Sequence, residues 1–193
     1  MSTLSGALAL ARRGVPVLPV HEPVGAGTPA VSCSCGRPDC ASVGKHPRTP
    51  HGLADASVDP DVIEAWWRRW PAANVGARTG VRWDVLDIDG PAGLCSLAQL
   101  VAANKVPDVI ATAVTGRPWS WHLLVPVTGA GNRAAMLPGV DFRGRSGYVV
   151  APPSLHPSGR RYQWQNIEPV DPVEHQRILA ACQRGLRVTG AAA

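Results

Sequence analysis

The sequence predicts an α+β fold in one domain over residues 1–185, with several antiparallel strand pairings and flanking helices. Three observations support this prediction. The 193 residues are 45% hydrophobic, which suffices for one substantial core. Apolar runs of strand length outnumber helical patterns and lack the regular strand–helix alternation of a parallel sheet. Residues 21–57 are rich in Gly, Pro, Ser and Cys and show no periodicity, which indicates a long loop.

The first two elements predicted along the chain are a helix and an edge strand. Residues 4–13 combine Leu and Ala in a short helical stretch, and Gly14 ends it. The apolar run 15–20 has strand character but contains two prolines. Because proline cannot donate a backbone hydrogen bond, we expect this strand at the edge of a sheet.

A second helix is predicted to begin after Asp59, a favourable N-cap that is followed by a proline at the first helical position. Pro71 ends this helix. Trp66 and Trp70 are four residues apart and therefore face the same side. We interpret both as core residues rather than as a platform on which bases stack.

The rest of the chain continues the α+β order. We predict strands at 74–78, 82–88, 109–114, 120–126, 139–143, 147–151 and 161–164. We predict helices at 91–103 and 172–184, and a frayed tail over 186–193. The sequence contains no internal repeat and no glycine-rich phosphate loop of the Walker type.

The net charge is +5 and the pI is about 9.3, and every basic residue except Lys45 and Lys105 is an arginine. Arginine pairs bidentately with phosphate, so this bias is consistent with a polyanionic partner. The alternative is the coding bias of a GC-rich genome, which the abundance of Ala, Gly and Pro also fits. The charge therefore gives only weak support for a nucleic-acid partner.

The composition predicts a cytoplasmic protein without membrane association. No apolar run is long enough to span a bilayer. In residues 1–13 the arginines follow the apolar stretch, which reverses the order of a secretory signal. An odd number of cysteines in such a chain argues against a disulfide framework. We therefore expect Cys95 and Cys182 to be buried core residues.

The long loop contains a cluster of metal-binding residue types. Three thiols and one imidazole form a Cys₃His set, which suits tetrahedral Zn²⁺. The set comprises Cys33, Cys35, Cys40 and His46, with His51 as a competitor for the fourth position. A structural zinc ion would fold the loop insertion over residues 30–52, whereas the alternative is three free thiols.

The predicted strand before residue 90 ends in the sequence Asp87-Ile88-Asp89. Because side chains alternate along a strand, the two aspartates point to one face, and Leu86 and Ile88 point to the core. Neighbouring carboxylates repel each other unless a positive charge lies between them, and Mg²⁺ and Mn²⁺ prefer such oxygen ligands. The alternative is an acidic turn, for which Asp-Gly is a common signal.

Three further segments place polar residues in pairs: Ser120 with His122, Asp141 with Arg143, and Ser154 with His156. The first pair shares one face at the start of an apolar strand. The second sets a third carboxylate beside a guanidinium that could hold phosphate. The third lies in a proline-fixed loop typical of a binding loop. Taken singly, the first two have ordinary alternatives, a satisfied buried histidine and a surface ion pair.

The ordered set of motifs resembles the archaeo-eukaryotic primase superfamily, and most closely the bifunctional DNA primase/polymerase (prim-pol) N-terminal domains. The three motifs are Asp87-x-Asp89, Ser120-x-His122 and Val140-Asp141. Supporting segments lie at 44–47, 70–76, 79–80, 115–116, 139–144 and 151–156. Each motif is short, but their order is specific, and the resemblance covers roughly residues 5–165.

The resemblance implies an RRM-like mixed sheet with flanking helices and a template-dependent nucleotidyltransferase activity that extends a 3′-hydroxyl. It implies that two Mg²⁺ or Mn²⁺ ions are held by Asp87, Asp89 and Asp141. It also implies that the incoming nucleotide is bound by Ser120, His122, Arg143, Ser154 and His156, with Arg78 and Lys45 as further phosphate contacts.

The partners implied by the resemblance are nucleoside triphosphates and a single-stranded or primed DNA template, bound by a monomer. Unwinding would come from a separate helicase. This chain departs from many members by carrying Trp119 and Trp121 where glycines are common, and we expect these side chains to narrow the nucleotide pocket. Two alternatives are a non-catalytic, zinc-stabilised nucleic-acid-binding module and a metal-dependent nuclease, which needs no triphosphate pocket.

Overall fold

A computed structural model describes residues 1–165 together with Ala180 and Cys182. Its helices are α1 (Thr3–Ala11), the 3₁₀ helix η1 (Gly52–Asp55), α2 (Pro60–Arg69) and α3 (Gly90–Ala102). Its strands are β1 (Val17–Val20), β2 (Pro23–Val24), β3 (Ser32–Cys33), β4 (Asn74–Arg78), β5 (Asp84–Ile88), β6 (Ala111–Val114), β7 (Trp121–Val125), β8 (Arg133–Leu137), β9 (Val140–Arg143), β10 (Tyr148–Ala151) and β11 (Gln163–Gln165).

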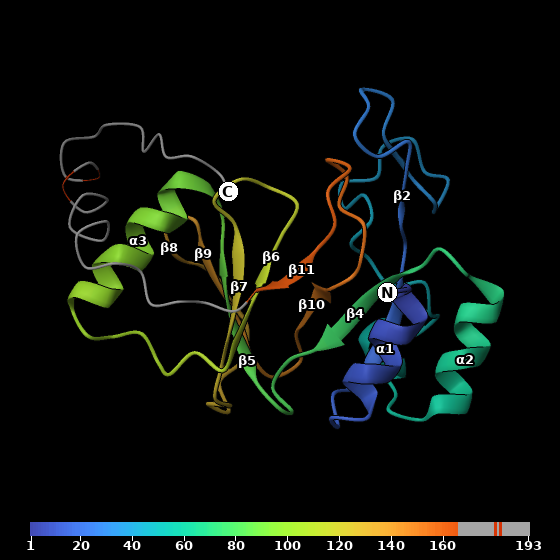
Figure 1. Ribbon diagram of the computed structural model, residues 1–193, viewed down its shortest axis with the longest axis horizontal. Helices are drawn as coiled ribbons and strands as arrows, with labels where there is room; N and C mark the ends of the chain where they lie inside the picture. The colour runs from blue at the N-terminus through green and yellow to red at the C-terminus, as the bar shows by residue number, and fades with distance from the viewer. Residues whose placement is uncertain (166–179, 181, 183–193) are drawn as a thin grey trace.

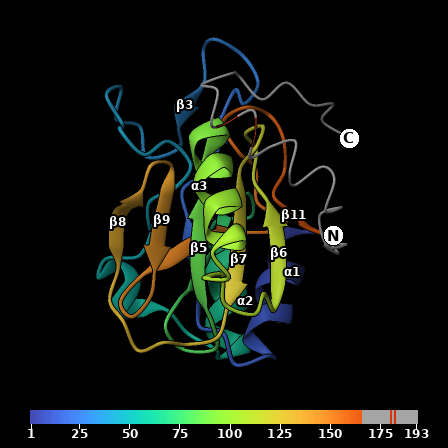
Figure 2. The same ribbon diagram turned by 90° about the vertical axis from the view of Figure 1, so that its left-hand side faces the viewer.

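The strands form two main sheets and one small ribbon. The larger sheet has the order β11-β6-β7-β5-β9-β8, the smaller one has the order β1-β4-β10, and β2 pairs with β3. Figure 1 shows α1 and α2 beside the smaller sheet, and Figure 2 shows α3 lying across one face of the larger sheet. Every pair of described strands is antiparallel, so the mixed sheet expected from the resemblance is wrong for this part of the chain.

Strand β5 separates two apolar clusters because its side chains alternate. Val85 packs into the cluster shared with α1, α2 and β4, where Val75 and Ala77 are fully buried. Leu86 and Ile88 point the other way, into the cluster covered by α3, and are 4% and 0% exposed. This confirms the core side predicted for these two residues and leaves Asp87 on the opposite face.

Most elements lie where the sequence predicted them. Strand β1 is an edge strand, as its prolines indicated. Helix α2 begins as expected, because the Asp59 carboxylate accepts a hydrogen bond from the backbone N–H of Asp61 at 2.9 Å. The most buried tryptophan of α2 is Trp67, however, while Trp66 and Trp70 are half-buried at the edge of the same cluster.

Strand β8 was missed because its sequence has no strand-like alternation of apolar and polar residues. Its first three residues are exposed, and its pairing with β9 is irregular between Arg133 and Leu137. Ala135 has a φ of 48°, which departs from extended geometry. An exposed and irregular edge strand leaves little periodic signal in a sequence.

The expectation that Cys95 and Cys182 are buried and unpaired is wrong. The two residues form a disulfide across a sequence separation of 87, and both are half-buried. The cysteine count is odd because the other three thiols form a separate cluster. The predicted helix 172–184, apart from Ala180 and Cys182, and the predicted tail 186–193 lie outside the described residues. Among the described helices, none is long and apolar enough to cross a membrane.

We predict that Trp67→Ala lowers the free energy of unfolding by about 3–5 kcal/mol, because it leaves a cavity in the core between α1, α2 and β4. It also removes the indole N–H that donates to Thr3 and to the carbonyl of Ala73. The matched control is Trp66→Ala, which trims a half-buried ring of the same helix. Urea denaturation measures both variants, and equal losses of stability would contradict this description of the core.

Candidate active site

The pairing of β5 with both of its neighbours brings three predicted residues together. Asp87 lies directly opposite His122 of β7 on one side and directly opposite Asp141 of β9 on the other. Cross-strand partners share one face of a sheet, so these side chains form a row across three strands. The row lies on the face turned away from α3. Residues distant in the sequence are thus aligned by strand register alone.

A polar cleft of about 330 Å³ opens over Asp87 and His122 of this row, whereas Asp141 does not line it. It is lined by Ser42, Lys45, Asp87, Asp89, His122, Arg143, Tyr148, Val149, Val150 and Tyr162. The walls therefore come from the larger sheet, from β10 of the smaller sheet and from the long loop. A larger cavity of about 670 Å³ lies between α1 and β6, but no acidic or histidine residue lines it. The smaller cleft is the candidate active site because the ionisable groups converge there.

Positive charge lies between the clustered carboxylates, as electrostatics requires. The Arg143 guanidinium donates a hydrogen bond to Asp141 and lies 3.9 Å from the second oxygen of Asp87. Burial and, next, repulsion from Asp89 raise the pKa of Asp87 to about 6, although the positive charge of Arg143 lowers it. Burial is therefore the main reason why Asp87 binds a proton more readily than a solvent-exposed aspartate does.

His122 is a neutral imidazole at neutral pH. Its ring is 6% exposed, and burial together with the positive charge of Lys45 lowers its pKa to about 4. The Nε2 atom of His122 is 3.5 Å from a carboxylate oxygen of Asp87, and this contact is not an ion pair because the ring carries no charge. A neutral imidazole can donate one hydrogen bond to a bound ligand.

The three carboxylates do not converge on a single point. Asp89 precedes α3 as its N-cap residue, yet its side chain caps no backbone N–H and remains exposed beside the cleft. Asp141 accepts a hydrogen bond from the backbone N–H of Ala135 at 2.7 Å. Across the described residues, the Cys/His cluster of the long loop is the only group of three or more potential ligands whose donor atoms all lie within 4.8 Å of one another.

Two tyrosines in the cleft were missed by sequence analysis. Tyr162 is 3% exposed, and its ring centroid lies 5.8 Å from those of both His122 and His156. Tyr148 lines the cleft from β10 and donates a hydrogen bond to the carbonyl of Lys45 at 2.8 Å. Tyr148 and Tyr162 lie within the predicted strands 147–151 and 161–164, and no sequence signal separated either of them from a core residue.

Three predicted nucleotide-binding residues have structural contacts and do not line the cleft. The Ser120 hydroxyl accepts a hydrogen bond from the backbone N–H of Gly90, at the start of α3. Ser154 is fully buried and accepts from the backbone N–H of Val75. His156 contacts Ser158 and packs so closely on Gly116 that a Cβ on this glycine would lie 2.1 Å from the histidine Cβ.

The two tryptophans expected to narrow the nucleotide pocket point elsewhere. Trp119 and Trp121 pack against the small apolar cluster of α3, with their rings edge to face at a centroid distance of 6.4 Å. Trp121 precedes His122 in β7, so its side chain lies on the opposite face of the sheet. Neither residue lines the cleft, and Arg78 does not line it either. The expectation of a narrowed pocket is therefore wrong.

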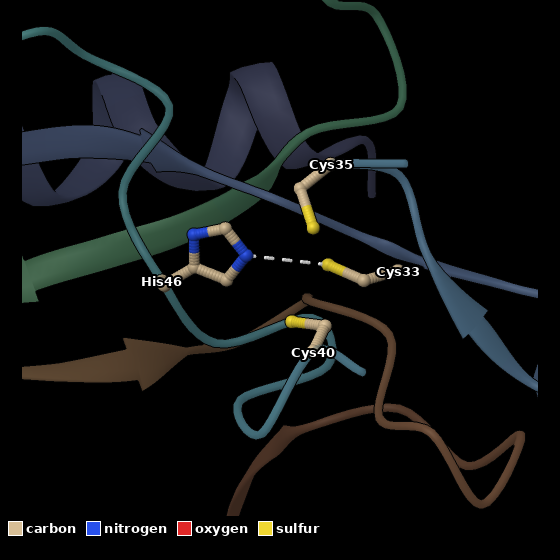
Figure 3. A group of neighbouring side chains, drawn as sticks. All are labelled: Cys33, Cys35, Cys40 and His46. Carbon is tan, nitrogen blue, oxygen red and sulfur yellow. Dashed lines mark hydrogen bonds between the residues drawn. The ribbon is translucent and has the colours of Figure 1, made fainter. Parts of the chain in front are cut away.

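The second predicted site is the Cys₃His cluster, which Figure 3 shows. The sulfurs of Cys33, Cys35 and Cys40 and one ring nitrogen of His46 lie within 4.8 Å of one another, and Cys33 Sγ is 3.4 Å from His46 Nε2. His51 is not part of the cluster, because its ring is paired with Asp55 at 3.0 Å. This donor set and its convergence fit a tetrahedral zinc ion.

The thiols of this cluster differ in their affinity for protons. A hydrogen bond from the backbone N–H of Arg37 is the main cause that lowers the pKa of Cys35 to about 6. Burial raises the pKa of Cys33, which is 4% exposed. Metal binding requires thiolates, but the buried thiol of Cys33 retains its proton when no cation is near. A metal ion at this point would stabilise the thiolate form of Cys33.

The fold and the cleft define an α+β protein in which carboxylates from β5, β9 and the start of α3 lie beside the cations Lys45 and Arg143. Residues 7–176 match the Prim-Pol family, described as bifunctional DNA primase/polymerase, N-terminal. This match spans most of the 193 residues, so the chain belongs to the Prim-Pol family, as the order of its motifs predicted. No curated protein matches the chain. Membership points to DNA primase/polymerase activity, with DNA template and nucleotides as substrates.

We predict that the purified protein contains about one equivalent of zinc, because a closed Cys₃His site binds this ion tightly. His46→Ala should lose most of the zinc, whereas His51→Ala, a histidine of the same loop outside the cluster, should retain it. Metal analysis by mass spectrometry measures both variants. Less than about a tenth of an equivalent in the unaltered protein after zinc-replete expression would refute this ligand set.

Proposed function

We propose that this chain is a divalent-metal-dependent nucleotidyltransferase that adds nucleotides to a 3′-hydroxyl under the direction of a DNA template. The observation that carries this proposal is the row formed by Asp141, Asp87 and His122 across three paired strands. Membership in the Prim-Pol family supports it. Clustered carboxylates would repel the phosphates of a simple nucleic-acid binder, so the row favours catalysis over binding alone.

The residues of the row fit hard divalent cations such as Mg²⁺ and Mn²⁺. Carboxylates are the ligands these ions prefer, and a cation beside Asp87 would stabilise the charged form of this buried carboxylate. Asp87, Asp89 and Asp141 would hold the ions. When bound, two such ions neutralise the charge that develops on the attacking and leaving oxygens.

The cationic and neutral donors of the cleft would hold the triphosphate. Arg143 lies beside the carboxylates, and its guanidinium would donate hydrogen bonds to phosphate oxygens. Neutral His122 would donate a hydrogen bond to a phosphate oxygen. The 3′-oxygen then bonds to the α-phosphorus, the bond from that phosphorus to the bridging oxygen breaks, pyrophosphate leaves, and the hydroxyl proton passes to solvent.

Three other sequence predictions remain part of this proposal. Ser120, Ser154 and His156 would act mainly by fixing the loops around the nucleotide, because each is buried and bonded to neighbouring chain. The zinc ion would be structural, because protein ligands fill all four positions. A monomeric state, a cytoplasmic location and a separate helicase partner are predictions that the sequence alone supplies.

We predict that Asp87→Asn lowers template-directed primer extension by about 10²–10³-fold, because it removes a charge that would hold the catalytic metal. Extension is measured with a primed template, labelled nucleotides and Mn²⁺. The matched control is Asp108→Asn, an exposed aspartate outside the cleft, which should keep full activity. Extension that is equal in all three proteins, or absent from all three, would refute the polymerase proposal.

Measurements of DNA binding, of nucleotide binding and of the length of an end-labelled primer separate the two alternative functions from the proposed one. A non-catalytic module would bind DNA in the presence of EDTA and show no affinity for nucleoside triphosphates. A nuclease would shorten the labelled primer, would need the metal, and would also bind no nucleotide. Nucleotide affinity therefore distinguishes the proposed polymerase from both alternatives.

We predict that the affinity of the nucleotide-free cleft for Mn²⁺ falls as the pH drops below about 6. The pKa of Asp87 is raised to about 6, so below this pH the metal must displace a proton. The expected loss is about tenfold per pH unit. Titration of Mn²⁺ by electron paramagnetic resonance between pH 5 and 7.5 measures it, and Asp87→Asn should remove the dependence. A constant affinity over this range would contradict the prediction.

A further inference from the structure

The long loop supplies one wall of the cleft as well as the zinc cluster. Ser42 and Lys45 both line the cleft, and both lie between the zinc ligands Cys40 and His46. Lys45 is adjacent in sequence to His46, so the metal-binding side chain and the cleft-lining side chain belong to neighbouring residues. This juxtaposition couples the position of a cationic side chain to the geometry of the zinc cluster.

The backbone around Lys45 is held from three sides. Its carbonyl accepts the Tyr148 hydroxyl at 2.8 Å, and the carbonyl of Gly44 accepts the side-chain N–H of buried Asn74 at 3.0 Å. The carbonyl of His46 accepts the backbone N–H of His21 at 2.9 Å. These bonds fix the C-terminal half of the loop against β10, the start of β4 and the residue that follows β1.

Gly44 permits this close approach. Its φ is 71°, and a Cβ at this position would lie 2.8 Å from the ring of Pro23, at the start of β2. In the N-terminal half of the loop, Ser34 contacts His21, Glu22 and Arg48 of the same loop. The cysteines on either side of it converge with Cys40 at the sulfur cluster. Zinc would join this half of the loop to His46, the neighbour of Lys45.

We infer that Lys45 binds the triphosphate of the incoming nucleotide and that the zinc cluster positions it, so that zinc occupancy sets nucleotide affinity. This inference rests on the proposed function and deepens it. A lysine ammonium is a compact cation with three donors, which suits phosphate oxygens. Lys45 lines the same cleft as Asp87, Asp89 and Arg143. A triphosphate bound beside the two aspartates would therefore lie near the Lys45 ammonium group.

The test measures equilibrium binding of a deoxynucleoside triphosphate with Mg²⁺, without primer, by calorimetry. Lys45→Ala should weaken binding about 10- to 100-fold, as expected for the loss of a charge-assisted contact, and Lys45→Arg should restore most of it. His46→Ala, which removes a zinc ligand, should weaken binding about tenfold. His51→Ala is the matched control and should bind as the unaltered protein does.

The double variant decides whether zinc acts through the lysine. In Lys45→Ala, the further change His46→Ala should alter the affinity less than about twofold, because the two residues act on one contact. Backbone hydrogen exchange of residues 42–48 should be faster in His46→Ala. This measurement detects the release of the segment independently of nucleotide binding. Unchanged circular dichroism and thermal unfolding outside the loop exclude a general loss of fold.

Two results would overturn the inference alone. One is nucleotide binding of unchanged strength in His46→Ala or in Lys45→Ala. The other is a loss on zinc removal that is equally large with and without Lys45, which would mean that zinc acts through another part of the cleft. By contrast, a zinc-loaded unaltered protein that binds no nucleotide would overturn the proposed function itself, and the role of Lys45 with it.

Discussion

The register of β5 between β7 and β9 is the constraint on which the site depends. It sets Asp87 opposite both His122 and Asp141 and turns all three away from the core under α3. A slip of one residue would bury the carboxylate of Asp87 and expose Leu86, at a large cost in free energy. The same apolar contacts that stabilise the sheet therefore also keep the charged row in place.

Charge balance follows from that arrangement. A partly buried carboxylate that faces two others is unfavourable unless cations are near, and Arg143 and Lys45 fill this role. Burial leaves His122 neutral, so the charged groups that line the cleft are the carboxylates Asp87 and Asp89 and the cations Lys45 and Arg143. Such a cleft is prepared for divalent cations and for the phosphates that accompany them.

The long loop both carries the Cys₃His cluster and supplies one wall of the cleft. A segment with few apolar residues cannot fold by burial alone, and the Cys₃His cluster replaces a core for it. The folded loop contributes Lys45 to the cleft, and the carbonyl of this lysine accepts a hydrogen bond from Tyr148. On the opposite face of the larger sheet, Trp119 and Trp121 pack under α3, which leaves the cleft open.

Local patterns in the sequence determined much of this protein. Strand alternation placed Asp87 and Leu86 on opposite faces, capping fixed the start of α2, and the clustering of soft ligands indicated the zinc loop. Only the tertiary structure decided which distant residues meet. His46 and not His51 lies in the cysteine cluster, and Cys95 forms a disulfide with Cys182. It also brought Tyr162 into the cleft. The reason is physical, because sequence periodicity specifies the face of a side chain, whereas its neighbours on other elements depend on strand register and loop closure over long separations.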